Sequence, residues 1–129
     1  MKLTQAKAIC EAAIDFAMKT KDGRDAQYVV PYLVSGAGIG KTTLVKDIAK
    51  SMGIGCEILS LAQYDAGELG GWAVPSDDGE TMVRKRPDWM PTKGKGILFL
   101  DELPQAPVSN QNIAAQITNE RRVGPHHLP

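Results

Sequence analysis

Long apolar runs are missing from this sequence of 129 residues, because the longest purely apolar stretch is Ile97–Leu100. A membrane-spanning helix needs about 20 apolar residues, so we expect no membrane contact of that kind. The opening residues Met1–Lys7 also lack the apolar stretch that a secretory signal requires. These two absences predict a cytoplasmic location.

Cysteine pairs and a charge excess are missing as well. Cys10 and Cys56 lie far apart, which argues against a disulfide framework or a zinc site and fits a reducing compartment. We expect both thiols to be buried bystanders. Lys plus Arg and Asp plus Glu number 15 each, so the formal net charge is zero. A balanced chain has no global field that attracts nucleic acid, and such contact would need a local patch.

The length suits a single domain. A helical pattern over Thr4–Thr20, with Ile9, Ala13 and Phe16 on its inward stripe, and a turn cluster make up a leading part, residues 1–25. The rest of the chain, residues 26–129, alternates between strands and helices. Strands are predicted at 28–34, 56–61 and 97–101, and helices at 42–52 and 107–122. This alternation predicts an α/β fold: a parallel sheet with helices on both faces, in three layers.

The segment between the second and third predicted strands, residues 62–95, is irregular. Turn signals at Gly70-Gly71 and at Asp77-Asp78-Gly79 interrupt it. Short β-rich arms at 72–74 and 81–83 flank the second turn and predict a β-hairpin.

A glycine-rich loop joins the first predicted strand to the next helix and resembles a Walker A motif. Bare backbone is needed there so that N–H groups can converge on phosphates, and the helix that follows turns its positive end toward the anion. The motif predicts that Lys41 reaches the outer phosphates and that the Thr42 hydroxyl binds Mg²⁺. Its predicted nucleotide-binding residues are Ser35, Gly36, Ala37, Gly38, Ile39, Gly40, Lys41, Thr42 and Thr43.

The loop departs from the usual Walker A motif at one position, and other interpretations of it must be compared. Ser35 stands where the usual motif has its first glycine, so the turn must be entered with a negative φ. A glycine-rich turn without function is the alternative interpretation. The rival dinucleotide pattern G-x-G-x-x-G does not fit, because Lys41 occupies the position of its third glycine, which argues against nicotinamide cofactors.

The apolar strand predicted at 97–101 ends in two acids, Asp101 and Glu102, and resembles a Walker B motif. Asp101 is the predicted Mg²⁺ ligand beside Thr42, and Glu102 is the predicted catalytic base for the attacking water, acting with Lys41. An Asp-Glu pair favours an ATPase over a small kinase or a GTPase.

With both motifs in place, residues 29–129 resemble an AAA+ P-loop ATPase of the MoxR-like, dynein-related kind. Asp65–Gly71 is similar to that family's acidic "D-x-x-x-L-G-G" segment, and residues 72–84 are similar to its hairpin insertion. The segment that begins at Asn119 is similar to the stretch before the family's fourth strand.

The resemblance implies ATP and Mg²⁺ as ligands, a homo-oligomeric ring, and hydrolysis that remodels a protein or nucleoprotein partner. The family's sensor strand, arginine finger and helical lid would follow Pro129. The resemblance therefore implies a module truncated before the sensor strand, with a gap in its sheet or a direct strand pairing that departs from the family. The missing parts favour an absence of turnover by this chain alone. A nucleotide-binding module without hydrolysis is the alternative function.

One dense basic run, Arg84–Arg86, has Trp89 nearby. Contact with a substrate or with single-stranded nucleic acid is one interpretation, because such proteins combine cations with stacking aromatics. A solvated loop is the other interpretation, and the zero net charge favours it.

Overall fold

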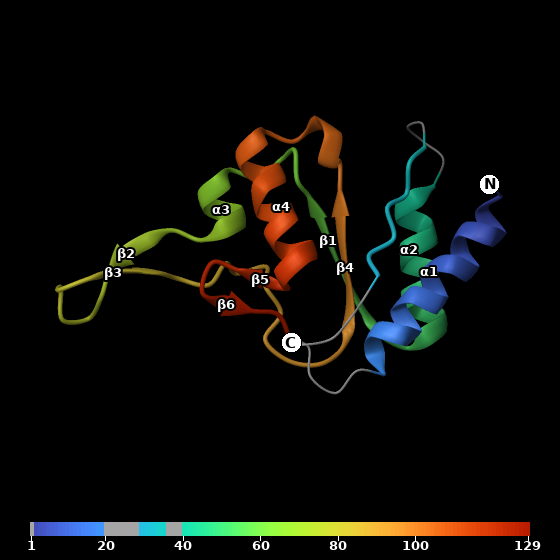
Figure 1. Cartoon of the computed structure of the whole chain (residues 1–129), viewed down its shortest axis with the longest axis horizontal. Helices are drawn as coiled ribbons and strands as arrows, with labels where there is room; N and C mark the ends of the chain where they lie inside the picture. Colours follow the sequence, from blue (N-terminus) through green and yellow to red (C-terminus); the bar gives the residue numbers. More distant parts are fainter. Residues whose placement is uncertain (1, 20–28, 36–39) are drawn as a thin grey trace. The chain divides into compact units, whose positions relative to one another are not determined.

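The structure is a computed structural model that describes residues 2–19, 29–35 and 40–129 (Figure 1). Its contacts divide the chain into a first unit, residues 1–58 with 95–99, and a second unit, residues 59–94 with 100–129. Strands β1 (Gly55–Ser60) and β4 (Gly96–Asp101) pair with one another, and each begins in the first unit and ends in the second. Among the residues that the structure describes, no helix is long and apolar enough to cross a membrane.

Helix α1 (Leu3–Met18) agrees with the helix predicted from Thr4 onward, and Thr20 lies outside the described residues. At its start the Lys2 amide donates a hydrogen bond to Gln5 Oε1 at 3.0 Å. At its end the Lys95 ammonium donates to the Met18 carbonyl oxygen at 2.6 Å. A cation at the carbonyl end is favourable for a helix, because this end carries partial negative charge.

The inward stripe that the sequence predicted for α1 is wrong at two of its three positions. Ile9 and Phe16 are 52% and 51% exposed, and Ala13, the third, is half-buried. The buried Cys10 and the half-buried Ala6 lie on the same face as Ala13, so the less exposed face of α1 carries small side chains. Burial raises the pKa of the Cys10 thiol, as does the nearby Glu11 carboxylate, which fits the predicted bystander role. Cys56 is only half-buried, and partial burial likewise raises its pKa.

Helix α2 (Lys41–Met52) forms as predicted, between two glycines with left-handed backbone. Gly40 at its start has φ 85°, and Gly53 at its end has φ 67°. The buried side chains Val45 and Ile48 belong to the predicted inward face. Gly53 donates a backbone hydrogen bond to Lys50, which satisfies a carbonyl that the ending helix would leave unpaired.

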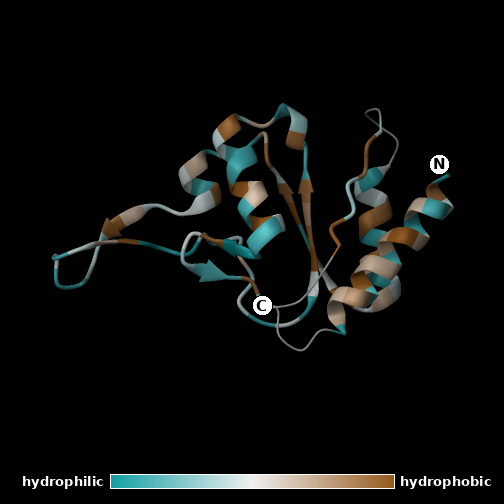
Figure 2. Ribbon diagram, viewed as in Figure 1, coloured by the Kyte–Doolittle hydropathy of each residue, from teal (hydrophilic) through white to brown (hydrophobic). Residues whose placement is uncertain are grey.

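The strand predicted at 28–34 is wrong for the residues that the structure describes, since 29–35 contain no strand. Four apolar side chains of this segment are exposed: Val29, Val30, Tyr32 and Val34. Figure 2 shows the apolar character of this part of the chain. A strand forms only beside a partner, and Pro31 also removes one of the donors that pairing would use.

Strands β1 and β4 are parallel, as the sequence predicted (Figure 1). Their beginnings lie together, because a Cβ placed on Gly96 would meet the Gly55 carbonyl oxygen at 2.9 Å. Their ends also lie together, where the Leu61 amide donates to the Asp101 carbonyl oxygen at 3.0 Å. Ile97–Leu100 are half-buried rather than buried, because β4 has β1 as its neighbour in a two-stranded sheet.

The second unit contains α3 (Ala66–Gly70), the short helix η1 (Leu103–Gln105) and α4 (Val108–Glu120). Strands β5 (Arg122–Val123) and β6 (His126–His127) form an antiparallel pair after α4. Helix α4 packs against α3 and β5, and it buries Ala114 and Ile117 as predicted. Ile113, which was also predicted to face inward, is half-buried. The fully buried apolar side chains of this unit are Leu59, Leu61, Leu69 and Val123.

The hairpin predicted from the turn at 77–79 is confirmed. Strands β2 (Ala73–Pro75) and β3 (Met82–Arg84) pair antiparallel, with Val74 opposite Val83. At the turn the Ser76 hydroxyl donates to Asp78 Oδ1 at 2.5 Å, and the Glu80 amide donates to the same oxygen at 2.9 Å. These hydrogen bonds lower the pKa of the exposed Asp78 carboxyl.

Gly71 joins α3 to the hairpin at a place where no side chain fits. It has φ 87°, and a Cβ there would lie 2.2 Å from the Lys85 carbonyl oxygen. Lys85 is fixed at that distance, because its amide donates to the Trp72 carbonyl oxygen at 3.1 Å. Gly71 of the acidic segment therefore has a structural reason: α3 ends against the outgoing hairpin strand.

We expect Gly71→Ala to destabilise the second unit more than Gly79→Ala does. Gly79 has φ 75° but nothing within 4 Å of a Cβ, so its substitution isolates the backbone strain, about 1–2 kcal/mol. Gly71→Ala adds an overlap with backbone atoms, which typically costs about 1–3 kcal/mol more. Urea unfolding of both variants measures the difference, and equal shifts of the two midpoints would contradict the close approach.

Candidate functional site

The glycine loop leads directly into α2. Gly40 is the N-cap of that helix, and no heavy atom lies within 4 Å of the place where its Cβ would stand. Lys41 and Thr42 are half-buried in the first helical turn, and Thr43 is exposed. The predicted residues Gly36, Ala37, Gly38 and Ile39 lie outside the described residues. The strand predicted before the loop is absent, and the helix predicted after it is present.

The Lys41 side chain reaches back to Ser35. Its ammonium donates to the carbonyl oxygen of Ser35 at 3.4 Å, so the lysine spans from the helix to the residue that opens the motif. The first N–H groups of a helix have no partners within the helix, and the helix dipole makes this end positive. Lys41 thus adds a full positive charge to a helix end that already favours anions.

The acidic pair stands at the end of β4. Asp101 is the last strand residue, and its Oδ1 accepts a hydrogen bond from the Glu102 amide at 2.9 Å. Glu102 is exposed, and its φ of 58° lies in the left-handed region that residues other than glycine rarely adopt. Holding it there costs about 1–2 kcal/mol. Strain of this kind gathers at functional sites, where the surrounding structure maintains it.

Ser60 is a neighbour of this pair that the sequence analysis missed. Its hydroxyl donates a hydrogen bond to the Glu102 carboxylate. Ser60 is the last residue of β1, and the ends of adjacent parallel strands meet at the same edge of a sheet. A polar residue at the end of the neighbouring strand was the signal that could have identified it.

The predicted residues therefore fall into two groups. Ser35 and residues 40–43 belong to the first unit, and Asp101 and Glu102 belong to the second. The structure joins Lys41 with Ser35 in one group, and Asp101 with Glu102 and Ser60 in the other.

Hard oxygen donors are the ligands that Mg²⁺ prefers, usually one or two carboxylates with the remainder from substrate phosphates and water. The Thr42 hydroxyl and the Asp101 carboxylate are donors of that type. Within the described residues no three His, Cys, Asp or Glu side chains gather as a metal site of their own. Each of these donors, taken by itself, thus has the chemistry of a ligand to a metal that is held largely by a bound phosphate.

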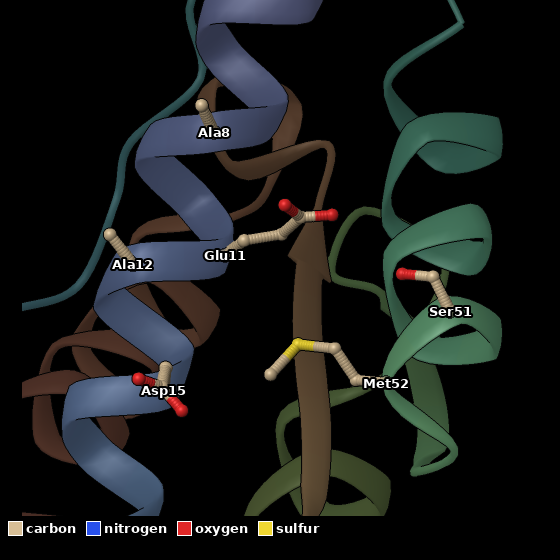
Figure 3. Close-up of a pocket in the computed structure, with 6 residues that line it drawn as sticks. All are labelled: Ala8, Glu11, Ala12, Asp15, Ser51 and Met52. Carbon is tan, nitrogen blue, oxygen red and sulfur yellow. The ribbon is translucent and has the colours of Figure 1, made fainter.

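A hollow of about 520 Å³ lies between α1 and α2, lined by Ala8, Glu11, Ala12, Asp15, Ser51 and Met52 (Figure 3). Glu11 and Met52 extend into it from the two helices. The carboxylates of Glu11 and Asp15 repel an anion. The lysines near them are already paired within α1, Lys7 with Glu11 and Lys19 with Asp15, each within 4 Å. This hollow lacks the donors that a nucleotide phosphate needs.

The basic run and its aromatic neighbour do not form a stacking platform. Arg84–Arg86 are exposed, as both interpretations of this run require. Trp89, however, is buried, and its indole N–H donates to the Leu69 carbonyl oxygen at 2.9 Å. A base cannot stack on a ring that is enclosed by the protein. His126 of the β5–β6 pair reaches the carbonyl oxygen of Arg84 at 2.7 Å, which fixes the start of this run.

A glycine loop that opens a helix, with an apolar strand ending in Asp-Glu, defines the class of P-loop nucleotide-binding proteins with an α/β fold. The profile of one family, the ATPase family associated with various cellular activities (AAA), matches residues 31–122. The match spans well over half of the chain, so the protein belongs to the AAA family. No curated protein and no solved structure matches the chain. Membership implies nucleotide binding, and members of the family are generally ATPases.

Proposed function

We propose that this chain binds MgATP and, in a complete and assembled module, hydrolyses it to drive the remodelling of a protein or nucleoprotein partner. The observation that carries the proposal is the placement of Lys41 in the first turn of α2, directly after the left-handed Gly40. AAA membership supports ATP as the ligand and oligomeric assembly as the usual state. The MoxR-like relationship, a homo-oligomeric ring and a cytoplasmic location are part of the proposal.

Binding is assigned to the first unit. The amide groups of residues 35–43 surround the phosphates, and the positive end of α2 attracts them. Lys41 leaves the Ser35 carbonyl and donates to the outer phosphates, where a charged hydrogen bond is stronger than one to a neutral carbonyl. Thr42 would supply its hydroxyl as a ligand for Mg²⁺, and the bound metal would offset negative charge on the phosphates.

Hydrolysis is assigned to the acidic pair of the second unit. Asp101 is the carboxylate ligand for Mg²⁺, and Glu102 accepts a proton from the attacking water. The left-handed backbone at Glu102 directs its carboxylate to Ser60, so the base is held at the end of the sheet before any water is bound.

Lys41→Ala should weaken MgATP binding at least tenfold, because a charged hydrogen bond to phosphate contributes about 1.5–3 kcal/mol. Lys46→Ala is the matched control, since Lys46 is an exposed lysine of the same helix. A titration with a fluorescent nucleotide measures both affinities, and far-UV circular dichroism checks that α2 remains folded. Equal affinities for the two variants would remove the assignment of the loop.

Glu102→Gln should keep nucleotide affinity and lose turnover by about 10²–10⁴-fold, because an amide cannot accept the proton. The measurement is phosphate release by a preparation whose parent protein turns over ATP, together with the dissociation constant for MgATP. Turnover near the parent value would place the base elsewhere. Binding without turnover in every assembled preparation of the parent would instead favour a nucleotide-binding module that does not hydrolyse.

A further inference from the structure

Asn110 is the one polar residue among the described residues whose side chain belongs to the buried core, with 0% exposure. It lies in the first turn of α4. Its amide nitrogen donates two hydrogen bonds, to the Leu61 carbonyl oxygen at 2.9 Å and to the Tyr64 carbonyl oxygen at 2.7 Å. One side chain thus ties α4 to both ends of the turn that follows β1.

The oxygen of the Asn110 side-chain amide differs from the nitrogen in its hydrogen bonding. Its Oδ1 is buried and has no hydrogen-bond partner among the described residues. An unpaired buried acceptor costs about 1–3 kcal/mol. Its two donated hydrogen bonds offset part of this cost by satisfying carbonyl oxygens of the turn, and they also impose a fixed geometry on residues 61–64.

The turn at residues 61–64, together with Ser60 just before it, makes the hydrogen bonds to Asp101 and Glu102. Gln63 donates a backbone hydrogen bond to Ser60, which closes the turn. Leu61 donates its amide to the carbonyl oxygen of Asp101, and Ser60 donates its hydroxyl to the carboxylate of Glu102. A shift of the turn would move both donors away from the end of β4.

We propose that Asn110 is a positioning residue for hydrolysis, which holds the turn after β1 so that Ser60 and Leu61 fix Asp101 and Glu102 in place. It touches neither nucleotide nor metal and acts through these two residues. The inference rests on the proposed function in one respect: Asp101 and Glu102 must be the groups that act on MgATP.

The test compares Asn110→Asp with Asn112→Asp. Aspartate matches asparagine in shape, but a carboxylate donates no hydrogen bond and would face two carbonyl oxygens. Asn112 is exposed on the same helix, so its variant adds the same charge without touching the turn. We expect Asn110→Asp to lower kcat at least tenfold with the dissociation constant for MgATP within about twofold of the parent, since a misplacement of 1 Å can cost about 100-fold. Asn112→Asp should match the parent in both.

Amide hydrogen exchange supplies a readout that does not need turnover. In Asn110→Asp the Leu61 amide should exchange at least tenfold faster, while the amides of Val45 and Ile48 in α2 keep their parent rates. Equal acceleration at all three, or an unchanged kcat in a variant with a fast-exchanging Leu61 amide, would overturn the positioning role. A parent protein that binds MgATP and never turns it over would refute the proposed hydrolysis, and unchanged exchange at Leu61 would then still overturn the role of Asn110.

Discussion

The parallel pairing of β1 with β4 is the constraint on which the acidic end of the molecule depends. Parallel strands end at the same edge, so the residues that leave β1 meet the residues that leave β4. Ser60 and Leu61 are placed against Asp101 and Glu102 for this reason. An antiparallel pair would set the acids beside the beginning of the neighbouring strand, where Gly55 offers no side chain at all. The direction of the strands therefore decides which groups can hold the acids.

The phosphate side of the function depends on backbone more than on side chains. Gly40 turns the chain into α2 with a left-handed conformation, and the helix end then exposes N–H groups and positive potential. Lys41 adds the charge that a neutral backbone lacks. The acidic side works in the opposite way, because two carboxylates and a hydroxyl supply the polar groups there. The two units thus carry complementary chemistry, one suited to an anion and the other to a cation and a water molecule.

What the sequence could predict was local. Helix α2, the strand β4, the helix α4 and the β2–β3 hairpin were found because apolar spacing, glycine stops and a turn signal lie within each segment. The strand at 28–34 was wrong because a strand also needs a neighbour, and alternating apolar residues do not say whether one is present. The inward face of α1 was wrong at Ile9 and Phe16 for a related reason: these side chains are larger and more apolar than Cys10, yet it is Cys10 that is buried. Lys41, Asp101 and Glu102 stood in recognisable patterns, whereas Ser60 and Asn110 reach the acidic pair only through folding.

Two local costs in the second unit fall at the same edge of the sheet. Glu102 adopts a backbone conformation that costs about 1–2 kcal/mol, and the unpaired oxygen of Asn110 costs about 1–3 kcal/mol. A domain is stable by only about 5–15 kcal/mol, so these costs are not negligible. Local preferences and global fold agree along most of a natural chain, and the exceptions gather where function requires them. Both costs fall in segments that hold Asp101 and Glu102. Arg121 has a left-handed backbone as well, but it caps the end of α4, a position where that conformation is common. The strain at Glu102 and the unpaired oxygen of Asn110 are therefore the two costs that the proposed role of this edge in hydrolysis would explain.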